Sequence, residues 1–268
     1  MVLSRQPDAV TFPPSNLLSD EPPLETDRHL KQIILLLMCL EWWWRDRPDA
    51  PEALRDNFYA AGNLTIYYSI HQRRSENFRG PDFFVVLDTE YRDRQSWVVW
   101  EEDGKYPNLI IEMLSTSTAT IDRGLKKQLY QNTFRTPEYF WFDPYSLEFR
   151  GFRHDGREYQ EIAPNEQGWL WSEQLELFLG IVAEKLRFLT PEGELVPAPT
   201  EAALQELVRS QQAEAQADRE RQRAESAEAE TDRERQRAEV ERQRAQQAET
   251  ELENLRRRLQ ERGIDLND

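Results

Sequence analysis

The segment that decides the fold runs from residue 80 to residue 144, and it contains GPDFFVV at 80–86, PNLIIEMLS at 107–115, DRGLKKQLY at 122–130 and PEYFWFDP at 137–144. The runs 83–87 and 109–111 are short, apolar and rich in aromatic and β-branched residues, which predicts buried strands. Asp82 opens the first run and Glu112 closes the second. Because a buried charge must be paired or bound to a cation, two carboxylates that converge there would suit a hard cation such as Mg²⁺.

The segment 121–134 is expected to be a helix with two different faces. Its apolar residues recur at roughly helical spacing, while three polar residues lie four apart and share another face: Asp122, Lys126 and Tyr130. If that face looks toward the strand ends, Lys126 brings an ammonium to the two acids, where it could hold a phosphate or orient a water. The same spacing also fits a structural salt-bridge network in which Lys126 only neutralises the acids.

These motifs resemble the Uma-type family of putative restriction endonucleases, a branch of the PD-(D/E)XK nuclease superfamily, over about residues 24–198. Asp82 matches the family's Pro-Asp signature, and Glu112 matches its apolar-Glu-x-Leu-Ser signature. The helix matches the pattern Asp-x3-Lys-x3-Tyr, and residues 137–144 match the strand that follows. Two residues after Glu112 stands Leu114, where the superfamily pattern has lysine, so that role passes to Lys126, with Lys127 as a less well aligned substitute.

The resemblance implies an α/β fold with a restriction-endonuclease-like mixed β-sheet core flanked by helices. It also implies a metal-dependent endonuclease that hydrolyses nucleic-acid phosphodiester bonds, with DNA expected more than RNA. Asp82 and Glu112 would bind Mg²⁺ or Mn²⁺, and Lys126 would stabilise charge on the phosphate. Supporting roles are expected for three residues, the last because an acid of the first helix joins the metal site in some superfamily members: Asp122, Tyr130 and Glu41.

Composition and charge set limits on this hypothesis. No apolar run approaches the roughly 20 residues that span a bilayer, no secretory signal is recognisable, and Cys39 is the single cysteine, so a cytoplasmic protein without membrane association is expected. The formal net charge of −16 counts against tight nonspecific binding of nucleic acid. The basic cluster at 71–74, together with Arg79, is the best candidate for a phosphate contact, and the alternative for it is a solvated loop. The competing hypothesis is a catalytically silent, nuclease-like interaction protein that assembles through its tail.

Three parts are expected along the chain: an extended Pro-rich arm at 1–25, the nuclease-like domain at 26–199 and a charged tail at 200–268. In the domain, Thr26 or Asp27 is expected to cap a helix that continues to about Trp44, with His29 as a capping residue or metal ligand. Gly62 is expected to form a turn before a strand at 63–69.

The tail is expected to form a long helix or a weak coiled coil. The motif DRERQRAE occurs at 218 and again at 232, two heptads later. A heptad frame places alanine and leucine at most core positions, but it also places three glutamates there: Glu220, Glu234 and Glu241. A homodimer through the last heptads therefore competes with a solvated single helix.

Overall fold

The computed structural model describes residues 17–19, 21, 24, 26–48, 50–69, 78–115 and 119–261. The chain divides into two compact units, Met1–Ala202 and Ala203–Asp268. Most of the arm expected at 1–25, and the basic residues at 71–74, lie outside the described residues. Within the described part, no helix combines the length and the apolar character needed to cross a membrane.

The first unit contains a six-stranded mixed sheet with the strand order β1-β4-β6-β7-β8-β9. These strands are β1 (Phe58–Gly62), β4 (Phe83–Leu87), β6 (Leu109–Met113), β7 (Glu138–Phe142), β8 (Phe149–His154) and β9 (Tyr159–Glu161). Only β6 and β7 pair in parallel within this sheet, and a helical segment at 119–134 makes the crossover that a parallel pair requires. The expected α/β class with a mixed sheet is confirmed.

Two smaller sheets flank the main one. The first has the order β3-β2-β5, formed by β2 (Ile66–Tyr67), β3 (Phe78–Arg79) and β5 (Trp97–Val98). The second has the order β10-β11-β12, formed by β10 (Leu170–Ser172), β11 (Leu177–Val182) and β12 (Lys185–Leu189). Leu179 and Phe188 of the second sheet share a buried cluster with Phe83 of β4, so this sheet covers one face of the main sheet.

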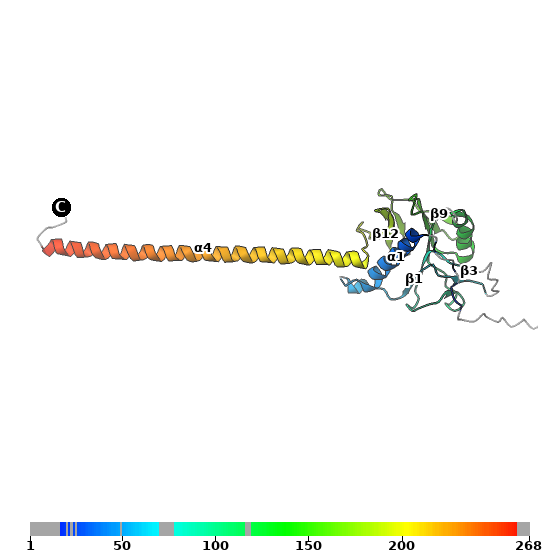
Figure 1. The fold of residues 1–268 in the computed structure, drawn as a ribbon, viewed down its shortest axis with the longest axis horizontal. Helices are drawn as coiled ribbons and strands as arrows, with labels where there is room; N and C mark the ends of the chain where they lie inside the picture. The colour runs from blue at the N-terminus through cyan, green and yellow to red at the C-terminus, as the bar shows by residue number, and fades with distance from the viewer. Residues whose placement is uncertain are drawn as a thin grey trace, which may run out of the picture. The chain divides into compact units, whose positions relative to one another are not determined.

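The helix α1 (Asp27–Glu41) lies on that same face, beside β1 and β12 (Figure 1). It begins at Thr26, whose hydroxyl accepts a hydrogen bond from the backbone N–H of His29, as the sequence predicts. Gln32 anchors it through two hydrogen bonds to the backbone of Leu186 in β12, at 2.8 and 3.1 Å. A π-helical turn, η1 (Trp42–Asp46), continues α1, and a 3₁₀ turn, η2 (Pro51–Ala53), follows.

The crossover at 119–134 covers the opposite face and alternates between α-helical and π-helical turns. Its parts are α2 (Ala119–Ile121), η3 (Asp122–Lys126), α3 (Lys127–Leu129) and η4 (Tyr130–Phe134), of which η3 and η4 are π-helical. The polar face of this helix is the buried one: Asp122 is 1% exposed and Tyr130 is fully buried, while Leu125 is 67% exposed. Interactions with the sheet thus override the apolar stripe that hydrophobic spacing alone would turn inward.

The strand β1 was not expected, and the turn expected at Gly62 is wrong. Gly62 ends β1 and pairs with Phe83 of β4, while in 63–69 only Ile66 and Tyr67 form a strand. The alanines of β1 are weak strand formers, which hides the strand in the sequence. A Cβ at residue 62 would approach the side chain of Ile33 to 2.3 Å, so this glycine allows α1 to pack closely on the sheet edge.

The C-terminal helix α4 (Pro199–Glu261) has 63 residues and makes up most of the second unit (Figure 1). The expected helical tail is confirmed. Side chains from 203 to 258 are all exposed. Burial of an apolar face therefore cannot account for this helix in a single chain. Alanine, glutamate, glutamine and arginine, which dominate its composition, are strong helix formers.

Candidate active site

The pairing of β4 with β6 brings Asp82 and Glu112 face to face. Phe83 pairs with Ile111 in antiparallel register, and extending that register by one residue places Asp82 opposite Glu112. Side chains alternate between the two faces of a strand, so Glu112 shares the face of Ile110, toward the crossover helix. The start of one acidic strand thus meets the end of the other.

Glu112 is fully buried, and both of its carboxylate oxygens are engaged. The hydroxyl of Tyr130 donates to Oε1 at 2.7 Å, and Nζ of Lys126 donates to Oε2 at 3.0 Å. The backbone N–H of Asp82 lies 3.4 Å from the same Oε2. Asp82, which is partly exposed, accepts a hydrogen bond at Oδ2 from the backbone N–H of Met113 at 2.7 Å.

Lys126 joins this pair to a third acid. Its Nζ lies 2.9 Å from Oδ1 of Asp122, one helical turn earlier, and its side chain is 18% exposed. The backbone carbonyl of Asp122 accepts a hydrogen bond from the hydroxyl of Tyr139 in β7 at 2.9 Å. The structure therefore brings five of the six predicted site residues into one cluster: Asp82, Glu112, Asp122, Lys126 and Tyr130.

The charges in this cluster do not balance when all its acids are ionised, because three carboxylates surround one ammonium. Burial, reinforced by the neighbouring charge of Asp82, raises the pKa of Glu112 to about 7 even though Lys126 opposes the shift. Burial also raises the pKa of Asp82. The three acids raise the pKa of Lys126 against the effect of burial, so the lysine stays charged. The cluster is therefore short of positive charge at neutral pH.

A divalent cation would correct this shortage. Among the described residues, the structure contains no group of three or more His, Cys, Asp and Glu side chains arranged to hold a metal ion. Mg²⁺, however, is commonly held by one or two carboxylates, with water and substrate phosphates completing its shell. Asp82 and Glu112 offer such a pair, and Lys126 now occupies one of the oxygens that a cation would use. The chemistry of the donors thus fits Mg²⁺ or Mn²⁺.

Two further candidates interact with other groups. Glu41 is the last residue of α1. Its pKa is raised by burial, and the charged groups that act on it are Arg45 and Asp46. The side chain of Lys127 points away from the acids, because its Nζ lies 3.4 Å from the ring centre of Phe152.

His29, for which the sequence allows a surface position, a capping role or metal binding, is a buried neighbour of the site. It is 4% exposed, and its Nε2 lies 3.2 Å from the carbonyl oxygen of Leu114, two residues after Glu112. A capping role explains only its backbone N–H. The buried ring ties the start of α1 to the chain that leaves the acidic strand.

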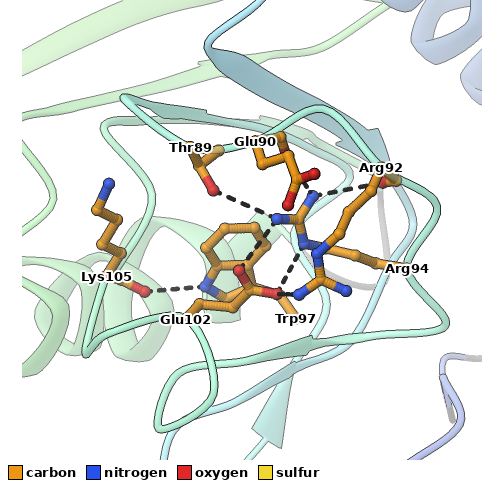
Figure 2. A network of polar contacts seen from close by, with 7 residues as sticks. All are labelled: Thr89, Glu90, Arg92, Arg94, Trp97, Glu102 and Lys105. Carbon is orange, nitrogen blue, oxygen red and sulfur yellow. Dashed lines mark hydrogen bonds and ion pairs between the residues drawn. The ribbon is translucent and has the colours of Figure 1, made fainter.

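The long connection between β4 and β6 is held by a second polar network (Figure 2). Arg94 and Glu102 have side chains only 2% and 9% exposed, and Arg94 donates to both carboxylate oxygens, at 2.7 and 3.0 Å. Arg92 adds a bond of 2.6 Å to the same glutamate. Trp97 donates from Nε1 to the carbonyl oxygen of Lys105 at 2.9 Å. The acids of this turn would be expected from sequence to be simply solvated; for Glu102 that expectation is wrong.

The fold and the cluster define a restriction-endonuclease-like protein, with an acid pair on adjacent strands and a lysine on the crossover helix. Residues 15–209 match the family model Uma2, described as putative restriction endonuclease, and the chain belongs to this family. No curated protein matches the chain. A similar solved structure is a putative nuclease belonging to DUF820 from Anabaena variabilis, with 12% sequence identity and a TM-score of 0.39, covering 58% of this chain and 76% of that one.

Proposed function

We propose that the protein is an endonuclease that hydrolyses phosphodiester bonds of nucleic acids, DNA in preference to RNA, and that it depends on Mg²⁺ or Mn²⁺. The observation that carries this proposal is the meeting of Asp82 and Glu112 across β4 and β6, beside the ammonium of Lys126. When bound, the cation would lower the pKa of a water molecule and polarise the phosphate. Family membership supports the same class of reaction.

The residues of the cluster have different roles in this proposal. Asp82 and Glu112 would hold the cation, and Tyr130 fixes the Glu112 carboxylate by its bond to Oε1. Lys126 would stabilise negative charge on the phosphate. Asp122 positions Lys126 through their 2.9 Å contact. Partial exposure of Asp82 and of the lysine side chain leaves a route for the substrate.

One observation favours the alternative, a catalytically silent interaction protein. Lys126 contacts both Glu112 and Asp122, so the acids already have a counter-charge without a metal ion. In that case the cluster would serve the stability of the domain.

The deciding experiment compares cleavage of single-stranded and duplex DNA and RNA by the wild type and isosteric variants, with Mg²⁺, Mn²⁺ or EDTA. The variants Asp82→Asn, Glu112→Gln and Lys126→Met each remove one proposed group. Lys127→Met is the matched control, because it removes the adjacent ammonium that faces away from the acids. Glu41→Gln tests the acid at the far end of α1.

We expect cation-dependent cleavage that falls by a factor of about 10² to 10⁴ in the three site variants and persists in the two others. Circular dichroism and urea unfolding verify that each variant is folded. Cleavage that survives Asp82→Asn and Glu112→Gln would overturn the assignment of the site. Absence of cleavage by a folded protein shown by calorimetry to bind Mg²⁺ would favour the interaction protein.

A further inference from the structure

The charged residues that flank the heptad core positions of α4 follow a regular pattern. In the frame that puts Ala217 and Leu252 at heptad position a, the two positions that flank the core, e and g, carry the same charge within every heptad. From the first heptad to the sixth, the signs are plus, minus, plus, plus, minus and plus. The residues are Arg221 and Arg223, Glu228 and Glu230, Arg235 and Arg237, Arg242 and Arg244, Glu249 and Glu251, and Arg256 and Arg258.

This pattern matches a parallel pairing of two identical helices. In such a dimer, position g of one helix faces position e of the next heptad in the other helix. Arg223 would then face Glu228 of the second copy, and Glu230 would face Arg235. The last heptads follow the same pattern of opposite charges, because Arg244 would face Glu249 and Glu251 would face Arg256. Only the middle pairing, 237 with 242, brings like charges together.

An antiparallel pairing fits less well. With the six heptads fully overlapped, position e faces e and position g faces g, and every heptad meets one of its own sign. A shift by one heptad restores most attractions, but in both antiparallel pairings the leucines at the end of each helix lie far from their copies. Of these arrangements, only the parallel one in register brings the leucines together: Leu252, Leu255 and Leu259.

The surface that this pairing needs is exposed. Leu252 is 52% exposed and Leu255 is 58% exposed, although both stand at core positions of the frame. Within the single helix, the guanidinium of Arg235 makes a loose contact of 3.8 Å with the carboxylate of Asp232, and both side chains are largely exposed. Such intrahelical pairs contribute little, so these charges remain available to a second helix.

We propose that α4 binds a second copy of this chain as a parallel, in-register, two-stranded coiled coil, whose direction and register are set by the charges at e and g. The inference is independent of the proposed nuclease activity. Glu220, Glu234 and Glu241 at core positions weaken the seam, so the apolar core fixes only the last heptads. The dimer is therefore concentration-dependent and is weakened by salt, which screens exposed charges.

A charge exchange in the full-length protein tests the pairing rule. One variant carries Arg235→Glu and Arg256→Glu at position e, and the other carries Glu230→Arg and Glu251→Arg at position g. Each alone should weaken its own dimer roughly tenfold or more in sedimentation, because attractions become repulsions at two levels of the coil. An equimolar mixture should form a heterodimer with near wild-type affinity, since every exchanged pair is again of opposite charge.

Arg219→Glu with Arg233→Glu is the matched control, because it makes the same change of charge at outward position c. This control should dimerise like the wild type. Single cysteines at core positions report direction: Ala224→Cys and Leu252→Cys should each form a disulfide with its own copy, whereas Gln243→Cys at outward position f should not. Cys39 is buried and does not interfere.

A wild-type chain that stays monomeric at about 100 µM would overturn the proposal. A mixture of the two exchanged variants that fails to associate would overturn it as well. A dimer in which neither core cysteine crosslinks to its own copy would indicate the antiparallel alternative, because residues 224 and 252 both lie far from the centre of such a pairing. A trimer or tetramer in sedimentation would contradict the two-stranded coil.

Discussion

Replacing Glu112 with glutamine is predicted to remove most of the pH dependence of stability near neutrality in the metal-free protein. Burial raises the pKa of Glu112 from 4.5 to about 7. The folded protein therefore binds this proton more tightly than the unfolded chain does. The stabilisation is complete below pH 4.5 and is lost as the pH rises through 7.

The size of the effect follows from the difference in pKa. One pKa unit corresponds to about 1.4 kcal/mol, so the rise to about 7 represents about 3 kcal/mol of unfolding free energy. Stability should fall by about that amount from pH 4.5 to pH 8. Asp82 acts in the same direction, because burial raises its pKa as well.

Urea unfolding in EDTA at several pH values, followed by the fluorescence of the eight tryptophans, measures this slope. Glu112→Gln should flatten the profile between pH 4.5 and about pH 8 without a change in the urea m-value. The control is Glu138→Gln, another fully buried glutamate, which is held by Arg153 at 3.1 Å. It should lower stability, because it removes a buried carboxylate partner of Arg153. A flat wild-type profile, or an unchanged slope in Glu112→Gln, would refute the reasoning.

Three further predictions concern stability and are measured in the same unfolding assay. Tyr130→Phe should cost about 1–2 kcal/mol by removing a buried 2.7 Å hydrogen bond to a carboxylate, and equal stability would show that the bond contributes nothing. Arg94→Met should cost about 1–3 kcal/mol, since it removes two hydrogen bonds to the carboxylate of Glu102 and leaves Arg92 as its cationic partner, whereas Arg92→Met, at a side chain 48% exposed, should cost under about 1 kcal/mol. Gly151→Ala should destabilise the sheet, because a Cβ there would lie 2.4 Å from the ring of Phe140; an unaffected variant would contradict this packing.

The acid pair could be predicted from the sequence because its signals are local. A carboxylate at the end of each buried strand marks Asp82 and Glu112, and the four-residue spacing places Lys126 on their side of the helix. Glu41 shows the limit of this reasoning: its position in the first helix is clear, but the groups that surround it depend on how α1 packs on the sheet. That packing is fixed by contacts between distant residues, such as the one between His29 and Leu114.

Other features depend on pairings between distant residues, which no local pattern reveals. The sequence of β1 has low strand propensity and could equally belong to a loop. Its position as a strand is set by pairing with β4 and by packing under α1. Glu102 is buried because Arg94, eight residues earlier, folds back onto it. In α4 the heptad spacing is visible in the sequence, but the structure of a single chain does not show which helix packs against it.

The π-helical turns of the crossover have a consequence for how this protein can change in evolution. Each residue of a regular α-helix turns the chain by about 100°, so the insertion or deletion of one residue between Asp122 and Tyr130 would rotate one of them away from Glu112. Wider turns such as η3 and η4 hold their side chains in phase only at the present length. Exposed positions such as Leu125 can change identity freely. Relatives that keep this cluster should therefore differ across the helix by substitution and not by length.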